Sequence, residues 1–359
     1  PIWTFRPGHL TRKIELPKAL SLTNWLDTQL LNEAHGQDVS ATIMALCEAG
    51  RILSGIISKG AMAPAAAVSI ATNADGDEQK ELDIRANELI MEMLVGQSVA
   101  WLASEELEDI REITPGGSLA VTTDPLDGSS NVDTNLSVGT IFSIYDATTL
   151  GQNAVLQPGR KQLAAGYIIY GPQTDLVLTL GQGTHVFTLD RARRQYFMVE
   201  ENVCIPEETT EFAINTSNFR HWDDSIRAYV GDCLDGEDGT RGVNFNMRWL
   251  ASLVAECHRV FSRGGIFLYP PDQRPGYENG RLRLVYEANA IALLVEQAGG
   301  QASTGLVPVL DIQPLSVHER VPLIFGSAAE VTRVENYYLE PRGGSRHSPL
   351  FANRGLFVN

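Results

Sequence analysis

The segment 124–131, DPLDGSSN, combines two kinds of chemistry in eight residues. Asp124 and Asp127 flank a proline that fixes the turn, so both carboxylates and the intervening Leu126 carbonyl could hold a hard divalent cation. The glycine that follows permits close approach, and a helix start leaves N–H donors free to face a phosphate. These donors would come from Gly128, Ser129 and Ser130. A DPxD string alone is typical of a plain turn and helix cap, but the whole string after a buried strand favours a site.

Further carboxylates occur at the ends of other predicted elements. They are Glu105 and Glu106 in the string SEE, Asp77 and Asp83 in the acidic stretch 76–83, and Glu287 in LVYEAN. Each one alone is typical of a solvated helix start, a capping loop or a strand end. Two unit charges 4 Å apart repel by about 4 kcal/mol at an effective dielectric of 20, so converging acids need compensation. Oxygen-only ligands favour Mg²⁺ or Mn²⁺ over Zn²⁺, which indicates metal-dependent phosphoryl transfer to water.

The composition bounds the class of protein. The 359 residues are 43% hydrophobic and 20% charged, and 28 Lys plus Arg against 44 Asp plus Glu give a net charge of −16. This charge argues against nucleic acid and anionic membranes as partners, but a local arginine cluster or a metal could still admit a phosphorylated substrate. We expect no transmembrane helix and no signal peptide, and the four dispersed cysteines indicate free thiols in a cytoplasmic protein.

Hydrophobic periodicity predicts an α/β protein. The predicted helices are 38–60, 82–95, 247–262 and 288–298; the predicted strands are 99–103, 119–123, 140–145, 164–170, 266–270 and 282–287, with a hairpin over 174–189. The stretch 61–80 is predicted to be a mobile loop. The strands 99–103 and 119–123 run into Glu105 and Asp124, and open α/β sheets bind ligands beyond the carboxyl ends of their strands.

The strings SEE, DPLDGSSNVD, GGIFLYP and LRLVYEAN, in this order and spacing, resemble class I fructose-1,6-bisphosphatases over about residues 38–335. The resemblance implies a layered α/β sugar-phosphatase fold, with alternating helix and sheet layers in two subdomains. It implies a regulatory-type domain over 1–205 that carries most metal ligands, a catalytic and substrate domain over 206–335, and a tail over 336–359. The implied reaction is hydrolysis of the 1-phosphate of fructose 1,6-bisphosphate to fructose 6-phosphate and phosphate.

The resemblance also implies roles for individual residues. Two or more Mg²⁺ or Mn²⁺ ions would be held by Glu105, Asp124, the carbonyl of Leu126, Asp127 and Glu287. The attacking water would be oriented or deprotonated by Glu106, aided by Asp77 and Asp83. The substrate would contact Asp127, Gly128, Ser129, Ser130, Asn215, Tyr269, Arg281 and Arg283. Arg248 would reach into the site of a neighbouring subunit, so we expect a homo-oligomer, with a tetramer favoured.

Some positions depart from the family pattern. Arg281 stands where the family usually has lysine, and Asn218 and Trp249 stand where it has tyrosines. The segment 35–40 only partly matches the turn that binds AMP in inhibited relatives, and Asp146 replaces a family arginine. A carboxylate beside a nucleotide phosphate repels it, so we expect weak or absent AMP inhibition.

Three alternatives stay open. A pocket discriminates one extra carbon unit by only about 1–3 kcal/mol, so the enzyme could also hydrolyse sedoheptulose 1,7-bisphosphate. A non-catalytic sugar-phosphate sensor would be expected to lack a metal carboxylate, and none is missing. An inositol-monophosphatase-like enzyme typically has DGT and a WDxAxG string, which the segment 222–225 matches only superficially. The sequence does not decide between gluconeogenesis and carbon fixation in the Calvin cycle, or between a dimer and a tetramer.

Overall fold

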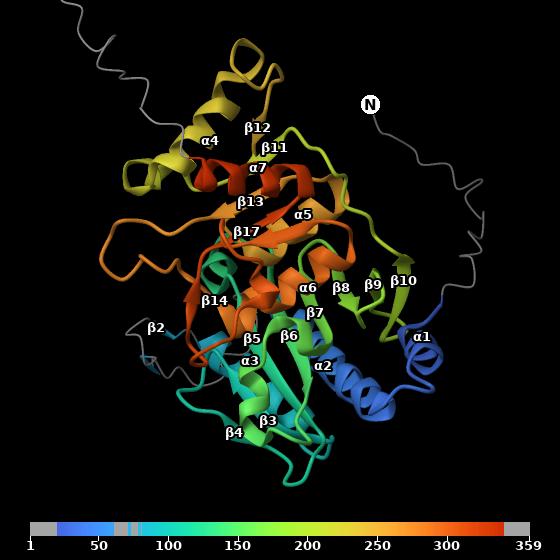
Figure 1. Ribbon diagram of the computed structural model, residues 1–359. Helices are drawn as coiled ribbons and strands as arrows, with labels where there is room; N and C mark the ends of the chain where they lie inside the picture. Colours follow the sequence, from blue (N-terminus) through green and yellow to red (C-terminus); the bar gives the residue numbers. More distant parts are fainter. Residues whose placement is uncertain (1–19, 61–70, 73–77, 80, 341–359) are drawn as a thin grey trace, which may run out of the picture.

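The computed structural model describes residues 20–60, 71–72, 78–79 and 81–340. Helix and sheet layers alternate through these residues, which confirms the predicted layered α/β fold (Figure 1). The predicted catalytic residue Asp77 and most of the 61–80 loop lie outside the described residues, as does the tail from 341. Of that loop, β1 (Ala71–Thr72) and β2 (Glu78–Gln79) form a short antiparallel pair.

An eight-stranded sheet holds the first half of the chain, in the order β10-β9-β8-β7-β6-β5-β3-β4. Its strands are β3 (Val99–Ser104), β4 (Arg111–Glu112), β5 (Leu119–Asp127), β6 (Val138–Asp146), β7 (Gln162–Tyr170), β8 (Thr174–Thr179), β9 (Thr184–Asp190) and β10 (Gln195–Glu200). Strands β3 and β5 are parallel, and all other neighbours are antiparallel. Ser104, the last residue of β3, therefore lies opposite Thr123, the residue before Asp124 on β5.

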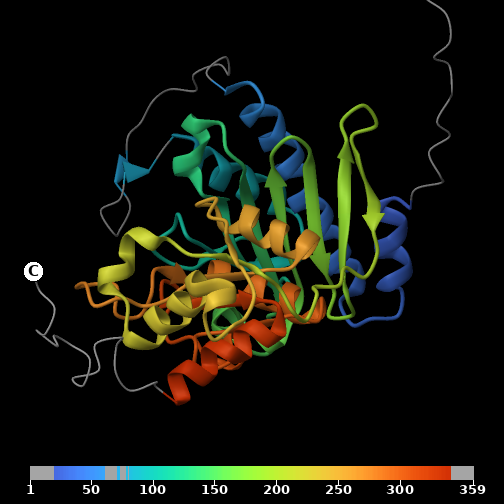
Figure 2. The same cartoon turned by 90° about the horizontal axis from the view of Figure 1, so that it is seen from above.

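Helices α1 (Leu22–Gln29), α2 (Gly36–Ile57) and α3 (Glu81–Leu94) cover one face of this sheet. Figure 2 shows these helices behind the green strands when the molecule is seen from above. Of the helices described, α2 alone is long and apolar enough to cross a membrane by length and composition. Its buried stripe, which includes Ile43, Leu46 and Leu53, packs in the core with strand side chains, so α2 is placed as a core helix.

Helices α5 (Leu253–Arg263) and α6 (Asn289–Gln297) pack on the other face of the large sheet. Beyond them lies a five-stranded sheet in the order β12-β11-β13-β17-β15. Its strands are β11 (Glu211–Ala213), β12 (Asn246–Met247), β13 (Ile266–Tyr269), β15 (Gln301–Ser303) and β17 (Leu323–Gly326). Helices α4 (Asp224–Asp235) and α7 (Ala328–Leu339) cover the outer face of that sheet. Residues of β14 (Leu282–Arg283) and β16 (Arg320–Val321) form a separate pair.

The structure corrects two predicted elements. The helix predicted over 247–262 begins only at Leu253, because Ser252 caps it by accepting a hydrogen bond from the Ala255 amide at 3.4 Å. The strand predicted over 282–287 ends at Arg283, and the chain continues as the π-helix η7 (Leu284–Ala288). Helix α7 also extends four residues past 335, to Leu339, so the segment after 335 begins as helix.

Candidate active site

Three buried carboxylates meet where β5 ends against η7. Asp124, Asp127 and Glu287 each offer an oxygen atom, and these atoms all lie within 4.8 Å of one another. Each carboxylate also accepts a backbone N–H. Asp124 accepts from Leu126 at 2.9 Å, Asp127 from Val254 at 3.0 Å and Glu287 from Arg283 at 2.5 Å. The backbone thus orients all three side chains of this carboxylate cluster.

Two local irregularities bring these carboxylates together. The β5–β6 register shifts between Asp124 and Asp127, so Pro125 and Leu126 bulge out of the ladder. In η7 the backbone takes a wider turn than an α-helix, and single π-turns are frequent at functional sites. Glu287 therefore projects from an irregular turn rather than from the strand end that the sequence predicted.

Among the described residues, the mutual repulsion of the carboxylate cluster is only partly compensated, by backbone N–H donors and by Arg283. Burial raises the pKa of Asp124 well above its usual range, and the charges of Glu105, Asp127 and Glu287 raise it further. Burial, with the charges of Glu105 and Asp127, likewise raises the pKa of Glu287. Burial raises the pKa of Asp127 to about 7, although the N–H donors of α5 oppose the rise. Such mutual repulsion fits a bound cation, and the all-oxygen donor set fits a hard divalent one.

The SEE string ends β3 beside this cluster. The Glu105 amide donates to the Thr123 carbonyl at 3.1 Å, and its carboxylate lies 3.7 Å from Nε of Arg283. Burial raises the pKa of Glu105, Arg283 opposes the rise, and the nearby Asp83 charge adds to it. The structure thus brings Asp83 and Glu105 together, with Glu105 adjoining the three clustered carboxylates. The half-buried Glu106 follows at the same strand end, its amide donating to Ser104 Oγ at 3.3 Å.

Behind Asp127 the chain turns into a short 3₁₀-helix, η2 (Ser129–Thr134). Gly128 adopts φ +74°, a conformation that favours glycine, and so re-aims the chain. Ser129 is half-buried and Ser130 is exposed at the start of η2. Asn131 ties this turn to the loop before α5 by donating to the Ala251 carbonyl at 2.7 Å.

A polar pocket on the second sheet collects most of the other predicted substrate residues. Asn215, Asn218, Tyr269 and Arg281 line it, together with Asp272. Burial raises the pKa of Tyr269, Arg281 opposes the rise and the Glu287 charge adds to it. The charge of Glu287 in the carboxylate cluster thus acts on a tyrosine of this pocket. Trp249 stacks on the Tyr269 ring at 6.1 Å, which gives the tryptophan a packing role.

The two predicted arginines of the LRLVYE segment have different surroundings. Arg281 precedes β14, lines the pocket and stacks over the Tyr277 ring at 4.6 Å. Arg283 is buried, faces Glu105 and donates to the His318 carbonyl at 3.1 Å. It does not line the polar pocket, and its predicted contact with the substrate stays a prediction.

Arg274, which sequence reasoning missed, contacts two residues that line the pocket, Asn218 and Asp272. Its Nη2 donates to Asn218 Oδ1 at 3.1 Å, and its Nε donates to Asp272 at 3.0 Å. Its guanidinium lies 4.9 Å from the Tyr277 ring, which Arg281 also contacts. A basic residue before GRLR was the only available signal, because the surrounding loop has no periodicity.

Arg248 lies exposed before α5. Its Nε is 3.2 Å from Oε1 of the buried Glu211, which also pairs with Arg259 and Arg263 at 3.0 and 2.6 Å. Its predicted reach into a neighbouring subunit stays a prediction. The WDDS string at 222–225 serves structure here, since Asp223 caps α4 by accepting the Ile226 amide at 2.9 Å.

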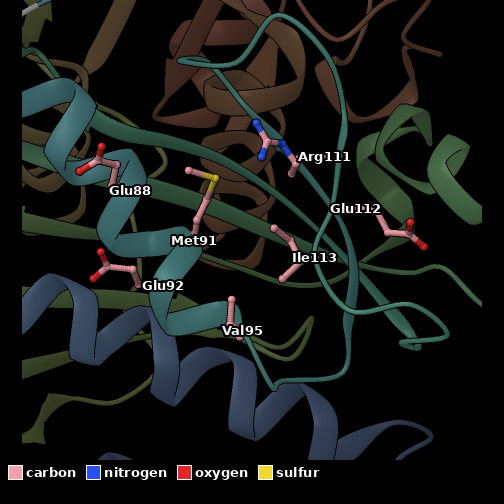
Figure 3. Close-up of a pocket in the computed structure, with 7 residues that line it drawn as sticks. All are labelled: Glu88, Met91, Glu92, Val95, Arg111, Glu112 and Ile113. Atoms are coloured by element: carbon pink, nitrogen blue, oxygen red, sulfur yellow. The ribbon is translucent and has the colours of Figure 1, made fainter.

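A separate shallow cavity of about 540 Å³ lies between α3 and β4 (Figure 3). Its lining includes Glu88, Glu92, Glu112 and Arg111, and Glu88 and Glu92 both pair with Arg85. This excess of negative charge disfavours a phosphate, and none of the predicted site residues lines the cavity.

Comparison with known proteins matches both halves of the chain to one enzyme family. The family model described as Fructose-1-6-bisphosphatase, N-terminal domain, matches residues 22–201, and the C-terminal domain model matches 205–339. The chain belongs to the fructose-1,6-bisphosphatase family. This membership confirms the sequence prediction of a phosphatase of that family.

Members of the fructose-1,6-bisphosphatase family from bacteria resemble it over nearly their full length. It is 50% identical to "Fructose-1,6-bisphosphatase class 1 1" of Nitrobacter hamburgensis, over 95% of this chain and 99% of that protein. It is 52% identical to "Fructose-1,6-bisphosphatase class 1" of Rhodopseudomonas palustris strain BisA53, over 89% and 93%. The solved structure of Leishmania major fructose-1,6-bisphosphatase in holo form matches with a TM-score of 0.83 at 31% identity, covering 90% of this chain and 100% of that one.

Proposed function

We propose that the protein hydrolyses the 1-phosphate of fructose 1,6-bisphosphate, using divalent metal ions, to give fructose 6-phosphate and phosphate. The observation that supports this most is the buried carboxylate cluster of Asp124, Asp127 and Glu287, whose repulsion calls for a cation. The polar pocket supports it further, because it is lined by Tyr269, whose pKa the charge of Glu287 raises. One end of a sugar bisphosphate can therefore react while the other is held.

The metal would be held by the three clustered carboxylates, with Glu105 and the Leu126 carbonyl as further ligands. We propose Mg²⁺ or Mn²⁺, with two or more ions in the site, because the donors are all hard oxygens. When bound, such ions neutralise the phosphate oxygens and make water a better nucleophile.

The chain's own residues would orient the reacting groups. Glu106, two residues after the end of β3, would accept the proton of the attacking water as its oxygen bonds to phosphorus and the bond to the sugar oxygen breaks, aided by Asp83. Asp77, which lies outside the described residues, remains a proposed helper. The amides of Gly128, Ser129 and Ser130 would hold the phosphate oxygens.

The distal phosphate and sugar would occupy the polar pocket. Asn215 and Tyr269 supply neutral donors, and Arg281 and Arg274 supply positive charge. Arg283 would act by holding Glu105 rather than by binding the distal phosphate. We further propose that Arg248 completes the pocket of a neighbouring subunit in a homotetramer.

We also propose a functional division of the chain near residue 205. The eight-stranded sheet ends at Glu200 and the five-stranded sheet begins at Glu211, which supports a boundary between them. The four free cysteines support a cytoplasmic location, since disulfides are rare there.

A substrate panel tests the proposal. Phosphate release is measured from fructose 1,6-bisphosphate, sedoheptulose 1,7-bisphosphate, fructose 6-phosphate and inositol monophosphate, with Mg²⁺, with Mn²⁺ and with chelator. We expect hydrolysis of fructose 1,6-bisphosphate only with metal. Release from sedoheptulose 1,7-bisphosphate would make the enzyme a dual bisphosphatase. No release from any of these compounds would contradict the proposal and favour a sensor.

A further inference from the structure

Two buried threonine hydroxyls lie against the backbone turns that carry the carboxylate cluster. Thr122, on β5, donates from Oγ1 to the Val285 carbonyl at 3.1 Å. Thr140, on β6, donates from Oγ1 to the Pro125 carbonyl at 2.8 Å. Both threonines are almost fully buried, and both accepting carbonyls belong to irregular backbone rather than to a regular ladder. Each hydroxyl therefore binds the backbone of a turn that carries a proposed metal ligand.

The Thr122 bond joins the two halves of the cluster. Thr122 and Asp124 share a face of β5, because alternate residues of a strand point the same way. Val285 belongs to η7, two residues before Glu287. The hydrogen bond thus ties the strand that supplies Asp124 to the turn that supplies Glu287, across 163 residues of chain.

The Thr140 bond fixes the spacing within the other pair of carboxylates. The bulge of Pro125 and Leu126 separates Asp124 from Asp127, and Thr140 binds the first carbonyl of that bulge. The Thr140 hydroxyl has one proton, which it gives to Pro125, so Tyr170 must donate to it across their 2.8 Å contact. This pair of hydrogen bonds, from Tyr170 on β7 through Thr140 to Pro125, holds the bulge in one conformation.

We propose that Thr122 and Thr140 are positioning residues that set the geometry of the carboxylate cluster for a divalent cation. The inference rests on the proposed metal-dependent function. Changes to groups that orient metal ligands typically weaken metal affinity by about 10–100-fold. We therefore expect each hydroxyl to control metal affinity more than it controls the stability of the fold.

Isosteric variants test this role with the full-length protein. Thr122→Val and Thr140→Val remove the hydroxyl and keep the shape, whereas Thr122→Ser and Thr140→Ser keep the hydroxyl. Thr123→Val is the matched control: Thr123 is equally buried on β5, but its Oγ1 donates at 2.8 Å to the Ile141 carbonyl of a regular β6 ladder. Calorimetry with Mg²⁺ alone measures the dissociation constant of each metal-free variant.

We expect the dissociation constant for Mg²⁺ to rise about tenfold or more in both valine variants, and to stay within about twofold of wild type in the serine variants and in Thr123→Val. At saturating Mg²⁺ the KM for the bisphosphate should be unchanged. If a valine variant does not fold by circular dichroism, the alanine variant replaces it and is compared with Thr123→Ala.

The outcomes distinguish failure of the proposed positioning role from failure of the proposed metal-dependent function. Valine variants that bind Mg²⁺ as tightly as Thr123→Val would overturn the positioning role while leaving the metal site intact. A wild-type protein that binds neither Mg²⁺ nor Mn²⁺ would instead contradict the proposed function itself.

Discussion

The backbone amide of Val254 donates a hydrogen bond to Oδ2 of Asp127 at 3.0 Å. Val254 lies in the first turn of α5, whose free N–H groups and dipole favour a negative charge. The helix therefore joins the second half of the chain to the carboxylate cluster. It also lowers the pKa of Asp127 relative to what burial alone would give.

The carboxylate cluster predicts a pH-dependent stability of the metal-free protein. The pKa of Asp127 is raised from 3.8 to about 7, so between these values the folded state binds more protons than the unfolded state. The free energy of unfolding should be highest below pH 3.8, as far as this group is concerned, and should fall as pH rises to about 7. Asp124 and Glu287 act in the same direction.

Thermal unfolding from pH 5 to 8 in chelator checks this, with a second series in Mg²⁺. The Tm should fall with pH in chelator and fall less with Mg²⁺, which compensates the charges. An Asp127→Asn variant should show a smaller slope in chelator. A Tm that rises through this range in chelator would contradict the assigned repulsion.

Glu106→Gln should reduce kcat by about 10²–10⁴-fold, because glutamine cannot accept the proton of the attacking water. The KM for the bisphosphate and the Tm should change little, since the amide keeps the shape of the half-buried side chain. Steady-state phosphate release at saturating Mg²⁺ measures this. Glu108→Gln, at an exposed position two residues on, is the control and should retain wild-type kcat. Near-normal turnover in Glu106→Gln would disprove its role.

Arg274→Ala should raise the KM for fructose 1,6-bisphosphate about tenfold, with a smaller effect on kcat. It removes a charged donor and also the hydrogen bond that orients Asn218 at 3.1 Å. Arg193→Ala, which removes an exposed arginine beside Asp190 on the distant β9–β10 hairpin, should leave KM unchanged. Equal KM values for the two variants would contradict a role of Arg274 in substrate binding.

AMP should inhibit weakly or not at all. At the start of α2, Asp38 accepts hydrogen bonds from Ser118 at 2.6 Å and Ser98 at 2.7 Å, which lower its pKa. Thr148 lowers the pKa of Asp146, whose carboxylate lies 3.7 Å from His35. Two charged carboxylates here repel a nucleotide phosphate. Activity titrated with AMP to millimolar levels measures this, and micromolar inhibition abolished by Ser40→Ala would refute it.

Local sequence was sufficient for part of the site. The DPLDGSSN string carries its own turn chemistry, and the strands that end at Glu105 and Asp124 are continuous apolar runs, so their positions were predictable. Open α/β sheets bind ligands beyond the carboxyl ends of their strands, which placed the expected site at the ends of these two strands. The clustering of Asp124 and Asp127 needed no distant information.

Other features depend on tertiary context. The string LRLVYE has the composition of a strand, and its turn into η7 is accompanied by contacts from distant parts of the chain, such as the hydrogen bond from Thr122 to the Val285 carbonyl. The apolar residues within 247–250 have the spacing of a helix, so the sequence predicted a helix there. The helix begins only after Ser252, which caps it. Arg274 has no local signal, since its partners Asn218 and Asp272 meet it only in the folded chain.

The carboxylates of the cluster are synthesised at widely separated times, which affects when the cluster can form. Glu287 is synthesised about 160 residues after Asp127, and the amide that orients Asp127 arrives 127 residues after it. Closing loops of this length is entropically unfavourable until other contacts form. An emerging chain therefore holds an incomplete set of oxygen donors until most of its translation is finished, so the proposed cation site can form only late in synthesis.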